Sequence, residues 1–212
     1  MTAPKRPRRT VERIFDTALQ LFNEFGEPNV TTTQIAAELA ISPGNLYYHF
    51  KSKEAIVEPL VDRFAAEIND VLFAPEDGPI TLEDLWLQLH LVFEIICRYR
   101  FIYRDINDLL SRYRKVRENF RRVVNQKITS TKAIFRGLTL AGEMDANEQE
   151  AAALARNVVL IATYWLSFEN ACDSRRSDGE IGHGVYQVMS AIAPFLVGES
   201  RLLLQRLSED YL

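Results

Sequence analysis

Three closely spaced helix-start signals near the N-terminus constrain the fold more than any other feature of the sequence. Thr10 can cap a helix in which apolar residues recur every three to four positions until Gly26. The hydroxyls of Thr31–Thr33 can cap a short second helix, and Ser42 followed by Pro43 can cap a third. Three short helices in so few residues predict a helix-turn-helix domain.

The rest of the chain shows helical periodicity, and no alternating strand pattern or internal repeat competes with it. Further helices are expected over about 53–73, 82–98, 103–111, 116–140, 147–172, 185–193 and 195–208. Pro59 is expected to kink the first of them, Pro75–Pro79 predicts a linker, and Ser174–Gly184 predicts a loop. The expected fold is all-α with about nine to ten helices, divided into a three-helix domain at 1–53 and a larger helical bundle at 54–212.

The composition narrows the class of protein. Hydrophobic residues make up 47% of the chain, which is enough for a buried core. Without a run of about 18 uncharged apolar residues, the sequence predicts a cytoplasmic protein with no membrane span. Cys97 and Cys172 stand far apart, and no catalytic or metal-binding motif occurs, so we expect no enzyme activity, no metal and no cofactor.

Charge is strongly segregated although the net charge is only -4. Residues 54–97 carry one Lys/Arg against ten Asp/Glu, a net of -9, whereas residues 98–136 carry twelve against three, a net of +9. The basic segment has three possible roles: to attract an anionic ligand such as a coenzyme A thioester, to contact DNA, or to neutralise the acidic helices.

The third short helix has the two faces that a DNA-reading helix needs. One face must be apolar to hold the helix in its domain, and the other must carry hydrogen-bonding groups into the major groove. Leu46 and Phe50, one turn apart, form the apolar face. On or beside the opposite face lie Gly44, Asn45, Tyr47, Tyr48 and His49.

The segment Ile35–Lys53, IAAELAISPGNLYYHFKSK, resembles the N-terminal signature of the TetR family of bacterial regulators. It contains the family's Leu-Tyr-x-His-Phe-x-x-Lys pattern at Leu46–Lys53. Ala40 departs from the family, which usually has glycine in this turn, and alanine is strained there if the backbone needs a positive φ. The stretches Tyr99–Phe101 and Val185–Pro194 are more loosely similar to TetR-type regulators of polyhydroxyalkanoate metabolism.

The resemblance implies a DNA-contacting surface. Asn45 is the best candidate to pair with an adenine, with Thr33 and the Pro43–Tyr47 stretch near base edges. The residues expected to contact DNA bases or phosphates are Thr32, Thr33, Ser42, Pro43, Gly44, Asn45, Tyr47, Tyr48, His49 and Lys53. The basic segment Lys5–Arg9 is either an arm that reaches DNA or a solvated tail.

The resemblance also implies a homodimer on a palindromic operator, a repressor function and a small-molecule effector of apolar or acyl type, such as a fatty acid or acyl-CoA. The expected dimer contacts, some of which could instead serve the monomer core, are Val158, Val159, Ala162, Trp165, Leu166, Tyr186, Met189, Ile192 and Phe195. The side chains that could line a ligand pocket, or simply form ordinary core, are Trp86, His90, Phe93, Phe101, Tyr103, Phe120, Tyr164, Trp165 and Phe168. The alternative functions are a helical adaptor or a pocket-containing protein that acts without DNA.

Overall fold

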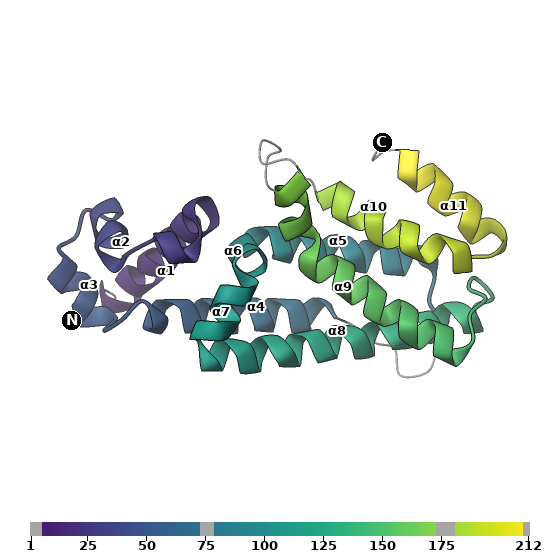
Figure 1. Ribbon diagram of the computed structural model, residues 1–212, viewed down its shortest axis with the longest axis horizontal. Coiled ribbons are helices and arrows are strands. Elements are labelled where there is room, and N and C mark those ends of the chain that lie inside the picture. Colours follow the sequence, from purple (N-terminus) through teal and green to yellow (C-terminus); the bar gives the residue numbers. More distant parts are fainter. Residues whose placement is uncertain (1–5, 73–78, 173–180, 210–212) are drawn as a thin grey trace, which may run out of the picture. The chain divides into compact units, whose positions relative to one another are not determined.

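The computed structural model describes residues 6–72, 79–172 and 181–209, and helices dominate all three stretches (Figure 1). The elements are α1 (Arg6–Phe25), the 3₁₀ turn η1 (Glu27–Asn29), α2 (Thr32–Glu38), α3 (Pro43–His49), α4 (Glu54–Val71), α5 (Leu82–Arg98), α6 (Arg100–Arg104), α7 (Ile106–Arg112), α8 (Arg114–Leu140), α9 (Glu148–Cys172), α10 (Ile181–Ile192), the 3₁₀ turn η2 (Ala193–Phe195) and α11 (Gly198–Glu209). The all-α expectation is confirmed, with eleven α-helices in the described stretches where about nine to ten were expected. Lys5 of the basic segment, most of the expected linker and residues 174–180 of the expected loop lie outside the described residues.

The two short helices of the helix-turn-helix begin at capping side chains. Ser42 caps α3 by accepting a hydrogen bond from the backbone N–H of Asn45 at 3.2 Å. Thr31 and Gln34 form a capping box at the start of α2, in which each side chain accepts a hydrogen bond from the other residue's backbone N–H. The start of each helix is therefore determined by two residues that are three positions apart in the sequence.

Helices α1 and α10 begin four residues earlier than the periodicity predicts. The first helix, α1, starts at Arg6 instead of Thr10, and a proline at position 7 is compatible with this start because the N–H groups of a first turn make no hydrogen bond within the helix. The second, α10, starts at Ile181, so residues 181–184 of the expected loop are helical. Glycine in this stretch favours a loop, but Gly184 is buried inside a helix.

One compact unit comprises residues 1–65 and 99–120, so the helix-turn-helix shares its core with a segment that comes much later in the sequence. The ring centroids of Phe22 and Phe101 lie 5.4 Å apart, and Phe64 packs edge-on against Tyr99 and Tyr103 at 5.7 and 5.6 Å. Phe101 and Tyr103 are completely buried. These aromatic contacts hold the late segment against the N-terminal helices.

The late segment contains two short helices where the periodicity predicts one over about 103–111. Helix α6 ends at Arg104 and α7 begins at Ile106. The break falls at Asp105, whose carboxylate accepts a hydrogen bond from the backbone N–H of Glu27 at 2.8 Å. A contact with a residue 78 positions away thus accompanies an interruption that local sequence does not reveal.

The second compact unit comprises residues 66–98 and 121–212, and α10 packs against both α5 and α9 within it. Gly184 of α10 lies against the ring of Phe93 in α5, and a β-carbon at position 184 would come within 2.2 Å of that ring. Only glycine lets α10 approach α5 so closely. Packing, not propensity, therefore places a glycine within this helix.

Helix α9 is the one helix among the described residues that is long and apolar enough to cross a membrane by length and composition alone. Its residues Leu154, Ala155, Val158 and Val159 are buried within the chain. Packing of α10 along α9 accounts for the buried part of this apolar composition.

Candidate nucleic-acid interface

The turn between α2 and α3 sets the geometry of the helix-turn-helix. Ala40 has φ 53°, in the left-handed region, and is the one non-glycine residue of the described chain with a positive φ. The N–H of Ala40 donates to the carbonyl of Ala37, and the N–H of Ile41 donates to that of Ala36, both at 3.0 Å. These two bonds form a Schellman motif in which the left-handed position is usually glycine.

Helix α3 is fixed to its domain by its apolar face, as the spacing of Leu46 and Phe50 predicts. Leu46 is almost fully buried, and the ring of Phe50 packs edge-on against Phe15 of α1 with centroids 5.1 Å apart. The backbone N–H of Phe50 also donates to the carbonyl of Leu46 at 2.8 Å. The opposite face of α3 is therefore held outward.

The outward face of α3 carries large and polar side chains in solvent. Tyr47 and Tyr48 are 58% and 76% exposed, and Asn45 and Gly44 are also exposed. Such aromatic exposure is costly for a surface that meets only water, so a binding partner is indicated. His49 is half-buried, with its ring edge-on to Tyr48 at 5.2 Å.

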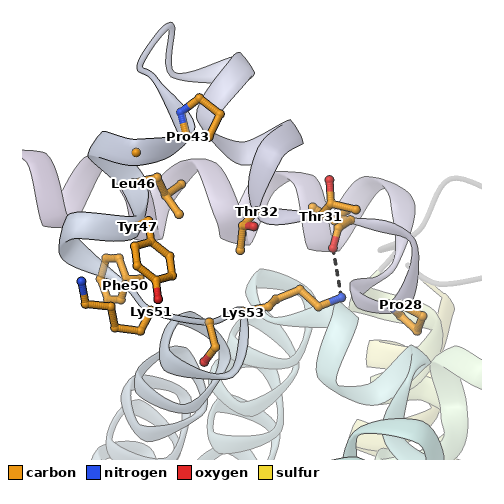
Figure 2. Close-up of a pocket in the computed structure, with 12 residues that line it drawn as sticks. Pro28, Thr31, Thr32, Pro43, Leu46, Tyr47, Phe50, Lys51 and Lys53 are labelled. Atoms are coloured by element: carbon orange, nitrogen blue, oxygen red, sulfur yellow. Dashed lines mark hydrogen bonds between the residues drawn. The ribbon is translucent and has the colours of Figure 1, made fainter.

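A groove of about 540 Å³ lies beside α3 (Figure 2). It is lined by Pro28, Val30, Thr31, Thr32, Pro43, Gly44, Leu46, Tyr47, Phe50, Lys51, Ser52 and Lys53. Lys51, which sequence reasoning does not single out, places its Nζ 4.4 Å from the centroid of the Tyr47 ring. This cation–π contact keeps a positive charge at the edge of the exposed face.

Lys53, expected to contact a DNA phosphate, instead has acceptors from its own chain. Its ammonium lies 2.9 Å from Glu27 Oε1 and donates to the backbone carbonyl of Glu27 at 2.8 Å. It also donates to the backbone carbonyl of Val30 at 3.0 Å, the hydrogen bond drawn as a dashed line in Figure 2. An ammonium has three hydrogens, and three acceptors are present. Glu27 is fully buried, and sequence reasoning misses it because its partners are distant along the chain.

Two cations of the basic 98–136 segment, Lys115 and Arg98, pair with the acidic 54–97 block. Lys115 Nζ lies 3.0 Å from Asp62 and 3.6 Å from Glu58, and the hydrogen bond to Asp62 raises the pKa of Lys115. Arg98 lies 2.6 Å from Glu67. For these residues, mutual neutralisation explains the charge segregation.

The nine candidate pocket residues divide between the two compact units. Phe101, Tyr103 and Phe120 are buried in the first unit, where aromatic packing accounts for them. The other six belong to the second unit and are Trp86, His90, Phe93, Tyr164, Trp165 and Phe168. The structure brings Trp86 and His90 together with centroids 3.9 Å apart, and Trp165 and Phe168 at 6.1 Å.

A second groove, of about 360 Å³, lies in the second unit and contains none of these nine residues. It is lined by Lys132, Arg136, Thr139, Leu140, Ala146, Glu148, Ala151 and Ala152. Within the described stretches, no group of three or more His, Cys, Asp or Glu side chains is arranged to hold a metal ion.

The residues expected at a dimer interface are mostly used by the protomer itself. Buried within the second unit are Val158, Val159, Ala162, Met189 and Ile192. Trp165, Leu166, Tyr186 and Phe195 are half-buried. The large apolar side chains that α9 leaves in solvent are Leu160, Tyr164 and Phe168, spaced by four residues and 57%, 40% and 59% exposed. Periodicity identifies the apolar helix but not which side faces outward.

Comparison with known protein families covers most of the chain. A family profile described as "Bacterial regulatory proteins, tetR family" matches residues 14–60, and one described as "Bacterial transcriptional repressor" matches residues 63–204. A crystal structure of a TetR-family transcriptional regulator from Marinobacter aquaeolei VT8 is 36% identical, has a TM-score of 0.85, and covers 95% of this chain and 98% of its own. Salmonella enterica GusR is 25% identical with a TM-score of 0.57, covering 89% of this chain and 97% of its own.

Relatives with curated functions match over shorter stretches. The Escherichia coli transcriptional regulator UidR is 39% identical over 61 residues, which is 29% of this chain and 30% of UidR. The negative regulator of the Staphylococcus aureus biofilm operon, IcaR, is 28% identical over 102 residues, or 48% of each chain. The chain thus spans about a third to a half of the length of these relatives. A regulator from Saccharomonospora viridis in complex with choline, 18% identical with a TM-score of 0.70, shares the fold.

Replacing Ala40 with glycine should raise the free energy of unfolding by about 0.5–1 kcal/mol, because glycine adopts the left-handed conformation without strain. The net gain is smaller than the strain removed, because glycine also increases the conformational entropy of the unfolded chain. Urea unfolding measures this change. Ala37→Gly in the neighbouring helix is the matched control and should lower the free energy of unfolding by about 0.5–1 kcal/mol. A destabilised Ala40→Gly variant would show that this turn does not require a positive φ.

Proposed function

Because the chain belongs to the TetR family of bacterial transcriptional regulators, we propose that it binds a palindromic operator as a homodimer and acts there as a cytoplasmic repressor. The observation that carries this proposal is the exposed face of the firmly anchored α3. Recognition helices of two protomers would enter successive major grooves about one turn of DNA apart. The proposed functional domains remain residues 1–53 for DNA and 54–212 for dimerisation and effector binding.

Asn45 is the proposed base-reading residue. Its side chain is exposed near the N-terminus of α3, where the amide can donate to and accept from one adenine. Gly44 beside it is open to solvent, and a β-carbon there would meet only Ser42 Oγ, at 4.0 Å. Thr33, Pro43 and Tyr47 would complete the base-facing surface.

Phosphate contacts would flank this surface. Thr32, Tyr48 and His49 keep the phosphate-contacting role expected from the resemblance, and Ser42 stays a proposed DNA contact. Lys51 joins the phosphate contacts because the ring of Tyr47 holds its ammonium at the groove. Phosphate contacts position the protein and make binding salt-dependent, whereas base contacts determine sequence preference. The two classes can therefore be separated experimentally.

Asn45→Ala should weaken binding to the best duplex selected from a random pool by the wild-type protein, by about 1–3 kcal/mol, and relax the preference at one base pair per half-site. Gel shifts at several salt concentrations measure affinity and salt slope, and the slope should be unchanged. Asn125→Ala, at an exposed asparagine of α8, is the control. If the wild-type protein selects no duplex, the alternative of a helical adaptor or pocket protein without a DNA role gains support.

The homodimer is proposed to form through the outward face of α9. Leu160, Tyr164 and Phe168 form an apolar stripe at helical spacing, and such stripes on a regulator of this family suit a self-complementary two-fold contact. The half-buried Trp165, Leu166, Tyr186 and Phe195 are retained as proposed contributors. The buried side chains that were expected at the interface would contribute indirectly, because they pack α9 against α10 and so position the outward face of α9.

Leu160→Glu combined with Phe168→Glu should convert the dimer to a monomer, because both substitutions bring charge into the proposed contact. Sedimentation velocity at micromolar concentration measures the change. Leu87→Glu, at a leucine of α5 that is 53% exposed, should leave the oligomeric state unchanged. A wild-type protein that sediments as a monomer would contradict the proposal.

The effector is proposed to be a small apolar or acyl-type molecule, related to fatty acids or acyl-CoA, that binds the second unit. Two polar groups there suit an acyl ligand: the indole Nε1 of Trp86 is buried without a hydrogen-bond partner in the described residues, and Lys127 is buried in α8. Burial lowers the pKa of Lys127 to about 7. A ligand carboxylate would favour its protonated form. The looser similarity to regulators of polyhydroxyalkanoate metabolism is kept only as part of this proposal.

Decanoate and decanoyl-CoA should raise the melting temperature of the protein. The shift caused by decanoate should shrink between about pH 6 and about pH 8.5, because Lys127 loses its proton over this range while the carboxylate stays ionised. Lys127→Met should abolish this pH dependence. Failure of both probes to shift the melting temperature at any of these pH values would end the acyl proposal.

A further inference from the structure

A buried carboxylate lies at the centre of a polar cluster in the first unit. Glu27 Oε1 lies 2.9 Å from Lys53 Nζ and accepts a hydrogen bond from Tyr113 Oη at 2.7 Å, while Oε2 is paired with Arg112. The backbone N–H of Glu27 donates to Asp105 Oδ2, and its carbonyl accepts from Lys53. Every polar group of this fully buried residue is therefore used.

The partners of Glu27 come from two directions along the chain. Lys53 immediately precedes α4, whereas Asp105, Arg112 and Tyr113 belong to the 99–120 segment. This segment also grips the end of α1: the N–H of Phe101 donates to Asn23 Oδ1 at 3.1 Å. The segment continues the chain from α5 and leads into α8, and both helices contribute residues to the second unit.

The cluster also fixes the start of α2. The Lys53 ammonium that pairs with Glu27 donates to the carbonyl of Val30, the residue before the N-cap Thr31. Thr32 and Thr33 follow in the first turn of α2 and are proposed DNA contacts. The path from α7 to the DNA-contacting surface thus consists of Arg112 and Tyr113, Glu27, Lys53 and the start of α2.

The buried carboxylate of Glu27 makes the contacts along this path depend on one another. A carboxylate removed from water is strongly destabilised unless cations and donors surround it. Withdrawal of Arg112 and Tyr113 would leave Glu27 buried with a single cation, and the turn that carries Glu27 would have to move. Burial and the hydrogen bond to Glu27 raise the pKa of Tyr113, which keeps its hydroxyl a donor.

We propose that Glu27 is a positioning residue through which the 99–120 segment controls the DNA-reading helices, and that Lys53 acts through Glu27 and Val30 rather than by contacting a phosphate. Displacement of α7 releases the turn, shifts the start of α2 and weakens DNA binding. The inference rests on the proposed DNA-binding function and adds the route by which the rest of the chain regulates it.

A salt-resolved double-mutant cycle tests the inference. The variants are Glu27→Gln, Lys53→Met, the pair together, and Tyr113→Phe, each assayed by gel shift on the duplex selected by the wild-type protein. Each single variant at Glu27 or Lys53 should lose at least tenfold in affinity with an unchanged salt slope, and the double variant should be no weaker than the worse single variant. Tyr113→Phe should also lose affinity, although it removes only a hydroxyl bonded to Glu27.

Lys51→Met is the matched lysine control and should lower the salt slope by about 0.9 for each phosphate that the side chain no longer neutralises. The same reduction in Lys53→Met, or additive losses in the double variant, would overturn the inference. Circular dichroism and thermal melting establish that each variant folds; if Glu27→Gln does not, Tyr113→Phe and Lys53→Met form the cycle. Tyr113→Phe binding like wild type would also overturn the inference while leaving the proposed function intact, whereas a wild-type protein that selects no duplex removes both.

Discussion

A carboxylate in a protein interior is tolerated only where cations and hydrogen-bond donors replace the water it has lost. Glu27 meets this requirement with Lys53, Arg112 and Tyr113, none of which lies in the 3₁₀ turn that contains Glu27. The N-terminal helices are therefore not stabilised by neighbouring sequence alone. The 3₁₀ turn η1, which lies between α1 and α2, is stabilised by the side chains of Arg112 and Tyr113. Both residues belong to the 99–120 segment, which is part of the same compact unit as the helix-turn-helix.

The parts of this site that could be predicted are those determined by neighbours in sequence. Ser42 and Pro43 indicate the start of α3, because a capping side chain and a proline affect only the first turn of a helix. The spacing of Leu46 and Phe50 indicates which face of α3 packs inward. The cluster around Glu27 could not be predicted, because its partners lie 26, 85 and 86 residues away. Lys53 illustrates the difference: its position in the motif is recognisable, but its partner is not.

Periodicity identifies apolar faces without saying what covers them. Phe101 and Phe168 each belong to an apolar pattern with helical spacing, yet Phe101 is fully buried and Phe168 is 59% exposed. Composition likewise indicates an unusual basic segment, but only the structure pairs Lys115 with Asp62 and Arg98 with Glu67. Assigning such residues to a core, a pocket or an interface requires the arrangement of helices that are remote in sequence.

The close approach of Gly184 to Phe93 has a consequence for how the chain folds. Helix α10 has only twelve residues, and its glycines at 182 and 184 cost it intrinsic helical stability, so it depends on the surfaces of α5 and α9. Because α5 and α9 precede α10 in the chain, we expect the docking of α10 to be a late event that completes the packing of these three helices rather than one that nucleates the second unit.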